Sequence, residues 1–291
     1  MIPKYSITGI KDIITESGVS DEFLSADLIL TSHGLKRNAI NYLKIGDKVK
    51  KKLFDVSEND LDLNTIVGEL EITDSLKVAI DISLLDRRRI ADVFVELTKL
   101  STKYRCKISI VYLLAKYSPP SGLPVSNHSV KPVSSFFSGW ANQPGLPIMT
   151  VVGLGYERDK AIGAIEYLES SRSFLFFPKS SEEQYFDDVL ATNSEIVSST
   201  DENHKINYRV ESPVEALLSL DSLLEANKNK YKIVLLPFGP KIFYAMNLLA
   251  SIVHSEVSVW HVSGEEEDGD SSQDREVASV FGFKFEMLVT N

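Results

Sequence analysis

The stretch "TVVGLGYERDKAIGAIEYLES" (residues 150–170) decides the fold class of this chain. Its apolar start predicts a buried strand, its glycines at 153 and 155 predict a tight turn, and the spacing of apolar residues beyond them predicts a helix. A dinucleotide-binding unit begins in the same way, but Arg158 stands where the third glycine of that fingerprint belongs. We therefore expect a Rossmann-like unit that holds no nicotinamide or flavin cofactor.

An earlier stretch, "ILTSHGLKRNAINYLK" (residues 29–44), has nearly the same design. In both, a glycine ends or closely follows the predicted strand, an arginine stands three residues later, and "AINYLK" or "AIEYLE" comes after it. The later copy has four more residues before that segment, which is about one helical turn, so the same helix face stays buried. The match predicts an internal duplication, although any two strand–helix units share some residue types.

Strand-like and helix-like segments alternate along the whole chain, which predicts an α/β fold with a largely parallel sheet. We expect two Rossmann-like halves, at residues 1–117 and 148–291, with further edge strands in residues 1–26 and 280–289. The elements expected in the first half span residues 26–32, 35–44, 51–57, 76–83, 86–101 and 106–118. Those expected in the second half span residues 147–155, 156–170, 173–181, 213–230, 231–239, 240–253 and 256–264.

Residues 118–147 are rich in proline, serine and glycine, which is typical of a linker. They also contain Phe136, Phe137 and Trp140, which a passive linker does not need. One interpretation is an arm that packs on a partner subunit or caps a cleft, and a homo-oligomer is compatible with it. The other is that these aromatic side chains fold back onto the core.

The formal net charge of −10 argues against binding to the phosphates of duplex DNA. The segment "SGEEEDGDSSQD" (residues 263–274) alone carries six carboxylates and is typical of a solvated loop. The remainder is only mildly acidic, so a local cationic pocket is compatible with the composition.

The sequence predicts a cytoplasmic protein with no membrane span. No run of 18 apolar residues is present, and the N-terminal residues lack the features of a signal peptide. The single cysteine, Cys106, excludes an internal disulfide and suits a reducing compartment.

Ligands of open parallel sheets bind beyond the carboxyl ends of the strands, where the strand order reverses. Glycines there let a phosphate approach the backbone, helix N-termini offer unpaired N–H groups, and arginines add bidentate contacts. The alternative is that the glycines only form turns and the arginines pair with surface carboxylates. The predicted ligand-binding residues are Ser32, Gly34, Arg37, Ser83, Arg87, Gly155, Arg158, Gly239 and Lys241.

A catalytic alternative uses His33, Asp81 and Asp86, which lie at or just beyond the carboxyl ends of neighbouring predicted strands. Carboxylates at such an edge serve N-glycoside hydrolysis or phosphoribosyl transfer, where one orients the ribose and another activates a nucleophile. The competing interpretation is that both aspartates cap the helix that begins at Arg87. The sequence contains no P-loop, no nucleophile elbow and no metal-ligand spacing among its five histidines, so we predict no metal and no cofactor.

The segment "IVLLPFGPKIFYAMNLLASIVHSEVSVWHV" (residues 233–262) resembles the closing strand–helix–strand unit of CRISPR-associated Rossmann-fold sensor domains, the CARF and SAVED families. In those families a Gly-Thr-Lys-type turn follows the first strand, whereas Gly239, Pro240 and Lys241 stand here. Proline removes a backbone donor, so phosphate binding by this turn differs from the family pattern. The resemblance implies a nucleotide sensor of a prokaryotic defence-type system that acts on a separate effector protein.

The leading prediction is a non-catalytic sensor or adaptor that binds a nucleotide-like anion at the strand ends. The enzyme described above is the first alternative. The second is a pure interaction subunit, which recognises a partner through the aromatic residues of the linker and the acidic loop.

Overall fold

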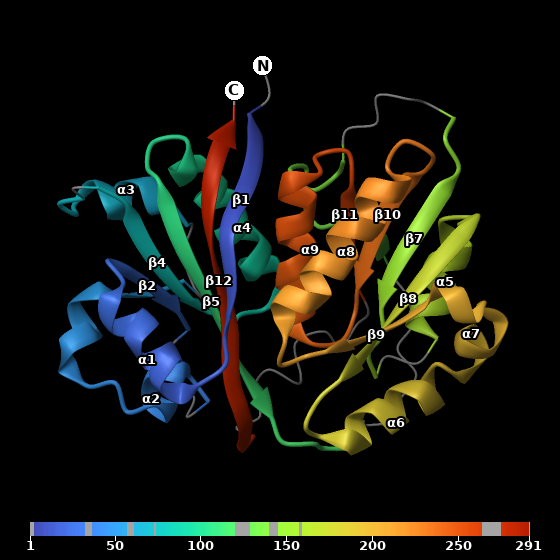
Figure 1. The fold of residues 1–291 in the computed structure, drawn as a ribbon, viewed down its shortest axis with the longest axis horizontal. Coiled ribbons are helices and arrows are strands. Elements are labelled where there is room, and N and C mark those ends of the chain that lie inside the picture. The colour runs from blue at the N-terminus through green and yellow to red at the C-terminus, as the bar shows by residue number, and fades with distance from the viewer. Residues whose placement is uncertain are drawn as a thin grey trace. The chain divides into compact units, whose positions relative to one another are not determined.

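The computed structural model forms two compact α/β units (Figure 1). Unit 1 consists of residues 1–116 and 271–291, and unit 2 of residues 117–270. Each contains a six-stranded sheet with both parallel and antiparallel pairs, so the predicted α/β class is confirmed. The structure describes residues 3–32, 37–56, 61–72, 74–119, 129–139, 145–156, 159–263 and 275–290. Within these ranges, no helix has the length and hydropathy that crossing a membrane requires.

The sheet of unit 1 has the order β1-β12-β5-β4-β2-β3. The strands β2, β3, β4 and β5 are parallel, whereas β12 is antiparallel to both of its neighbours. The strand bounds are Lys4–Ile13 for β1, Leu28–Thr31 for β2, Leu53–Asp55 for β3, Leu76–Asp81 for β4, Cys106–Ala115 for β5 and Val277–Thr290 for β12.

Helices α1 and α2 and the 3-10 helix η1 share one apolar core with this sheet, which includes Phe23, Ile29, Ala39 and Val49. Helices α3 and α4 contact each other. The predicted helix at 35–44 is limited to α2 in the described residues, because Asn38 caps its start. The helix bounds are Glu16–Ser25 for α1, Ala39–Tyr42 for α2, Asp47–Lys52 for η1, Leu63–Gly68 for α3 and Arg87–Ser101 for α4.

Strand β12 corrects the predicted domain boundary, which placed residues 148–291 together. It lies between β1 and β5 in the sheet of unit 1, as an inner strand and not as an edge strand. Its phenylalanines at 281, 283 and 285 are buried, and a Cβ at Gly282 would lie 1.9 Å from the carbonyl oxygen of Ile110 in β5. Glycine there permits the two strands to approach. The edge strand expected in residues 1–26 is confirmed as β1.

The sheet of unit 2 has the order β6-β11-β10-β7-β8-β9. Five of its strands are parallel, and β6 is antiparallel to β11. The strand bounds are Ser129–Pro132 for β6, Ile148–Gly153 for β7, Arg172–Lys179 for β8, Lys205–Arg209 for β9, Lys232–Pro237 for β10 and Ser258–Ser263 for β11.

One apolar cluster of unit 2 joins the sheet to α5, α6 and α7, through residues that include Ala164, Val189 and Ile196. Helices α8 and α9 pack against each other. The sequence predicted α5, α8 and α9 but not α6, α7 or η2. The helix bounds are Lys160–Tyr167 for α5, Glu183–Thr192 for α6, Ser194–Ser199 for α7, Glu202–His204 for η2, Pro213–Asn227 for α8 and Lys241–Val253 for α9.

The predicted aromatic arm folds back onto unit 2 in its described part. Residues 129–132 form β6, and the carbonyl oxygen of Phe137 accepts a hydrogen bond of 2.9 Å from the backbone N–H of Val259. Phe137 is fully buried and meets Phe136 edge-to-face, with the ring centroids 5.0 Å apart. Phe137 is therefore a core residue and not a docking residue. Trp140 lies outside the described residues.

Candidate functional site

The strand order reverses once in each sheet, which marks the place where open α/β sheets bind ligands. In unit 1 the chain leaves β2 for β3 on one side and returns to β4 on the other; in unit 2 the same reversal lies between β7 and β10. The predicted site residues follow these four strands. His33, Gly34 and Arg158 lie outside the described residues.

Asp81 connects three elements at the carboxyl ends of the strands in unit 1. It is 1% exposed, and its Oδ2 accepts a 2.6 Å hydrogen bond from the backbone N–H of Ala39, the first residue of α2. Its Oδ1 accepts from Ser83, from the N–H at 3.0 Å and from the Oγ–H at 2.5 Å. The Ser83 hydroxyl oxygen in turn accepts from the N–H of Leu113 in β5, at 2.9 Å. The carboxylate thus fixes α2 and β5 relative to β4.

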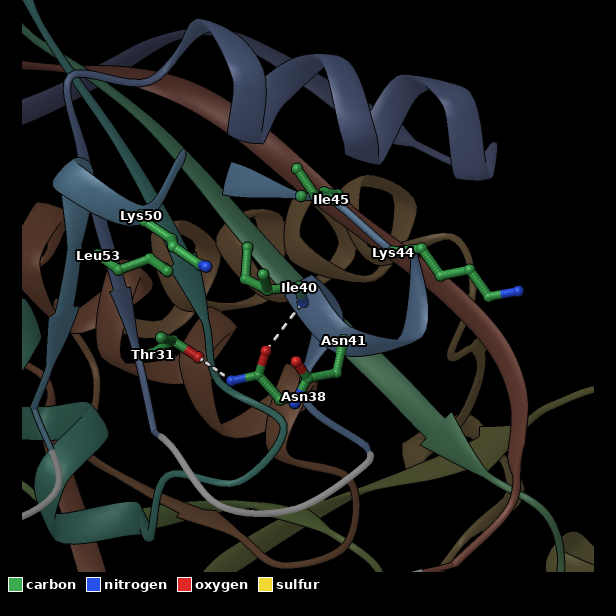
Figure 2. Close-up of a pocket in the computed structure, with 9 residues that line it drawn as sticks. Thr31, Asn38, Ile40, Asn41, Lys44, Ile45, Lys50 and Leu53 are labelled. Atoms are coloured by element: carbon green, nitrogen blue, oxygen red, sulfur yellow. Dashed lines mark hydrogen bonds between the residues drawn. The ribbon is translucent and has the colours of Figure 1, made fainter. Parts of the chain in front are cut away.

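Asn38 continues this buried network toward β2 (Figure 2). Its Nδ2 donates to Thr31 Oγ1 at 2.5 Å and to the carbonyl oxygen of Ser32 at 2.6 Å. Its Oδ1 accepts from the N–H of Ile40 at 2.9 Å and so caps α2. Buried polar networks whose members are satisfied hold a single geometry, because breaking any one bond leaves a desolvated group unpaired.

These contacts bear on the catalytic alternative. Asp86 is exposed and accepts a 2.6 Å hydrogen bond from the N–H of Arg89, so it is the N-cap of α4. The capping interpretation is confirmed for Asp86. The Asp81 carboxylate holds α2 and the Ser83 turn, not α4, and both of its oxygens are engaged. The geometry of both aspartates favours structural roles over acid–base chemistry.

A pocket of about 410 Å³ lies beside this network, between the end of β2, α2 and η1 (Figure 2). The lining combines three apolar side chains, hydroxyl and amide groups, and two lysines. The lining residues are Thr31, Asn38, Ile40, Asn41, Lys44, Ile45, Gly46, Lys50 and Leu53.

The electrostatic character of this pocket is opposite to that of the chain. Residues 44–52 contain five lysines and one aspartate, in a protein of net charge −10. Lys50 extends toward Thr31 and Ile40, whereas Lys44 extends away from them (Figure 2). Lys52 has a structural role, because its Nζ donates a 2.7 Å hydrogen bond to the carbonyl oxygen of Ala26, the C-cap of α1.

Sequence reasoning missed these lysines. The "DKVKKK" run (residues 47–52) was a usable signal, because it is the densest cluster of cations in the chain and adjoins a predicted strand end. The interpretation of residues 51–57 as a short strand took no account of charge.

Three predicted binding residues, Ser32, Arg37 and Arg87, do not line the pocket. The carbonyl oxygen of Ser32 is occupied by Asn38. Arg37 precedes Asn38, and its Nε is buried with no hydrogen-bond partner within the described part of the chain. Arg87 is the first residue of α4.

The corresponding strand ends in unit 2 are closed by backbone packing. Gly239 has φ +77°, and a Cβ there would lie 2.4 Å from the carbonyl oxygen of Leu154. Leu154 is fully buried, and the carbonyl oxygen of Gly155 accepts a 2.9 Å hydrogen bond from Asn193 Nδ2. The close approach that Gly239 permits is therefore that of a neighbouring loop. Lys241 begins α9 directly after Pro240, its N-cap.

Cys106 is buried in the core of unit 1. Burial raises the pKa of the Cys106 thiol to about 12, so at neutral pH it is protonated and a poor nucleophile. Among the residues that the structure describes, no group of three or more His, Cys, Asp or Glu side chains could hold a metal ion.

Comparisons with known proteins identify no family. No protein-family model, no curated protein and no solved structure matches this chain significantly. The resemblance to CARF and SAVED domains stays a prediction, and a function has to be inferred from the pocket and its charges.

Proposed function

We propose that unit 1 binds a small nucleotide-like anion in the pocket beside β2 and catalyses no reaction. The observation that supports this most is that a 410 Å³ pocket beside the end of β2, one of the two strands that flank the reversal, is lined by both Lys44 and Lys50. Small-molecule pockets measure about 300–1,000 Å³, so this one suits a single nucleotide-sized ligand. Lysines attract phosphate as point charges.

The walls of the pocket suit a ligand with two different ends. Ile40, Ile45 and Leu53 offer an apolar surface for a ring, and the lysines offer charge for an anionic group. The Asn38 amide is already committed to the buried network, so it shapes the wall more than it recognises a ligand.

A regulatory role follows from this proposal. With Asp81 and Asp86 engaged at helix starts, unit 1 would act as a sensor or adaptor whose ligand-bound state is recognised by a separate partner protein. The expected setting is a prokaryotic defence-type system.

We also propose that the two units arose by an internal duplication. The order β3-β2-β4-β5-β12 in unit 1 corresponds to β8-β7-β10-β11-β6 in unit 2, with the last strand antiparallel in each. The correspondence supports a common origin for the two units, each with one added edge strand.

Binding is tested by thermal shift and calorimetry with nucleoside monophosphates, cyclic dinucleotides and inorganic phosphate. A ligand at 100 times its dissociation constant should stabilise the protein by about 2.7 kcal/mol. We expect Lys50→Ala to weaken binding about tenfold, equivalent to about 1.4 kcal/mol, and Lys44→Ala to weaken it less.

Lys77→Ala is the matched control, because Lys77 is an exposed lysine of unit 1 near the amino end of β4. It should bind as the wild type does. A lack of binding by every anion, or equal affinities in the Lys50 and Lys77 variants, would contradict the proposal.

A further inference from the structure

The helix that follows β2 in unit 1 ends in the same way as the helix that follows β7 in unit 2. The segment "AINYLKI" (residues 39–45) matches "AIEYLES" (residues 164–170) without a gap. The alanine that begins each segment is fully buried, and the tyrosine is the last helical residue of both α2 and α5. The two segments therefore occupy equivalent positions, residue by residue.

The turn that ends each segment has one backbone geometry. Lys44 has φ +52° and Glu169 has φ +49°, so both adopt the left-handed conformation. The N–H of Lys44 donates to the carbonyl oxygen of Asn41 at 3.2 Å, and the N–H of Ile45 donates to that of Ile40 at 3.0 Å. The equivalent bonds in unit 2 are 3.0 Å and 3.2 Å long. Backbone atoms alone complete this Schellman pattern, so the side chains can differ while the turn stays the same.

The side chains at two of these equivalent positions differ in charge. Asn41 and Lys44 line the pocket of unit 1 (Figure 2), and their equivalents in unit 2 are Glu166 and Glu169. All four residues are exposed. One lysine and one asparagine give the pair of unit 1 a net charge of +1, whereas two glutamates give the pair of unit 2 a net charge of −2. Lysine attracts a phosphate as a point charge, and carboxylates repel it.

The wall of the pocket that carries Lys50 also belongs to unit 1 alone. Gly46 and the six-residue η1 lie between Ile45 and the start of β3. In unit 2, Ser171 alone lies between Ser170 and the start of β8. The strands β3 and β8 are equivalent, because each pairs in parallel with the strand before the helix. A connection of one residue has no room for a 3-10 helix, so Lys50 has no equivalent in unit 2.

We propose that Asn41 and Lys44 determine the anion specificity of the unit 1 pocket, and that only one of the two equivalent helix ends binds an anion. This inference rests on the proposed binding of a nucleotide-like anion in unit 1. The frame that both units share supplies the strand, the helix and the turn. The two side chains and η1 supply the charge and the wall that make a site of this frame. The chain therefore binds one ligand and not two, despite its repeated architecture.

The test is equilibrium dialysis with radiolabelled AMP and, separately, with radiolabelled cyclic di-AMP, which gives the dissociation constant and the number of sites per chain. We expect a single site in the wild type. The double variant Asn41→Glu/Lys44→Glu, which copies unit 2, should raise the dissociation constant by about thirtyfold or more, because like charges then face each other. It should still fold, since Glu169 adopts the same left-handed conformation in unit 2. Circular dichroism and thermal unfolding check the fold.

Asn229→Glu/Lys230→Glu is the matched control, because it makes the same two substitutions at exposed residues that follow α8 in unit 2. It should leave both the affinity and the number of sites unchanged. Two sites per chain in the wild type, or equal dissociation constants in the two double variants, would overturn this inference and leave the proposed function standing. Absence of binding by the wild type would overturn the proposed function, and this inference with it.

Discussion

The two units reverse their strand order in the same way but close the strand ends differently. In unit 1, side-chain hydrogen bonds of Asp81 and Asn38 hold the ends together and leave a pocket beside them. In unit 2, the loop at Gly239 packs its backbone directly on the carbonyl of Leu154. The comparison shows that one topology permits either an open pocket or a closed backbone contact, depending on whether side chains or backbone atoms meet at the strand ends.

Replacing Gly239 should have the largest effect on stability, because it disrupts the backbone contact between Gly239 and Leu154 in unit 2. The Gly239→Ala variant combines a left-handed backbone with a clash against a carbonyl oxygen, and we expect it to destabilise unit 2 by about 4 kcal/mol. Chemical denaturation measures this loss.

Gly145→Ala separates strain from the clash. Gly145 also has a positive φ, of +94°, but a Cβ there meets nothing within 4 Å. Its variant should therefore lose only about 1–2 kcal/mol. Equal losses in the two variants would show that the contact with Leu154 contributes nothing.

Removing the Asp81 carboxylate should disrupt the hydrogen-bond network that connects the strand ends of unit 1. Asp81→Ala leaves the N–H of Ala39 and both donors of Ser83 without their acceptor, and we expect a loss of about 3 kcal/mol in the free energy of unfolding. Asp86→Ala, which removes only an exposed N-cap, should cost about 1 kcal/mol. If Asp81→Ala destabilised the protein no more than Asp86→Ala, the Asp81 network would not be what holds the strand ends of unit 1 together.

Much of this arrangement could be predicted from local sequence. Apolar runs identified the strands on both sides of each reversal, and helices with clear apolar periodicity, such as α4 and α9, were located correctly. These signals are local, because strand and helix periods are visible within ten residues.

Other features depend on partners that are distant in sequence. The predicted place of β12 was wrong because its pairing with β5 joins residues as far apart as Cys106 and Met287, which are 181 positions apart. The sequence left the role of Phe137 open between a docking arm and the core, because its burial depends on contacts with β11, more than 100 residues later. The sequence also did not show that Gly239 permits the approach of Leu154, since only the fold shows which atoms lie next to it.

The smallest expected effect concerns the rate at which Cys106 is alkylated. Cys106 is the single cysteine of the chain and belongs to unit 1, so its alkylation reports on unit 1 alone. With its pKa raised to about 12 by burial, the native thiol should scarcely react with iodoacetamide at pH 8. Alkylation should then follow the opening of β5 and accelerate in Asp81→Ala but not in Gly239→Ala. Mass spectrometry over time measures the rate, and rapid alkylation of the native wild type would contradict the burial.

The position of β12 has a consequence for synthesis on the ribosome. All six strands of unit 2 lie within residues 129–263, so this unit can complete its sheet on the nascent chain. The sheet of unit 1 lacks an inner strand until residues 277–290 emerge, and β1 has no neighbour in the sheet before then. Until that moment β1 and β5 expose unpaired edges, which makes this the interval in which chaperones are most needed.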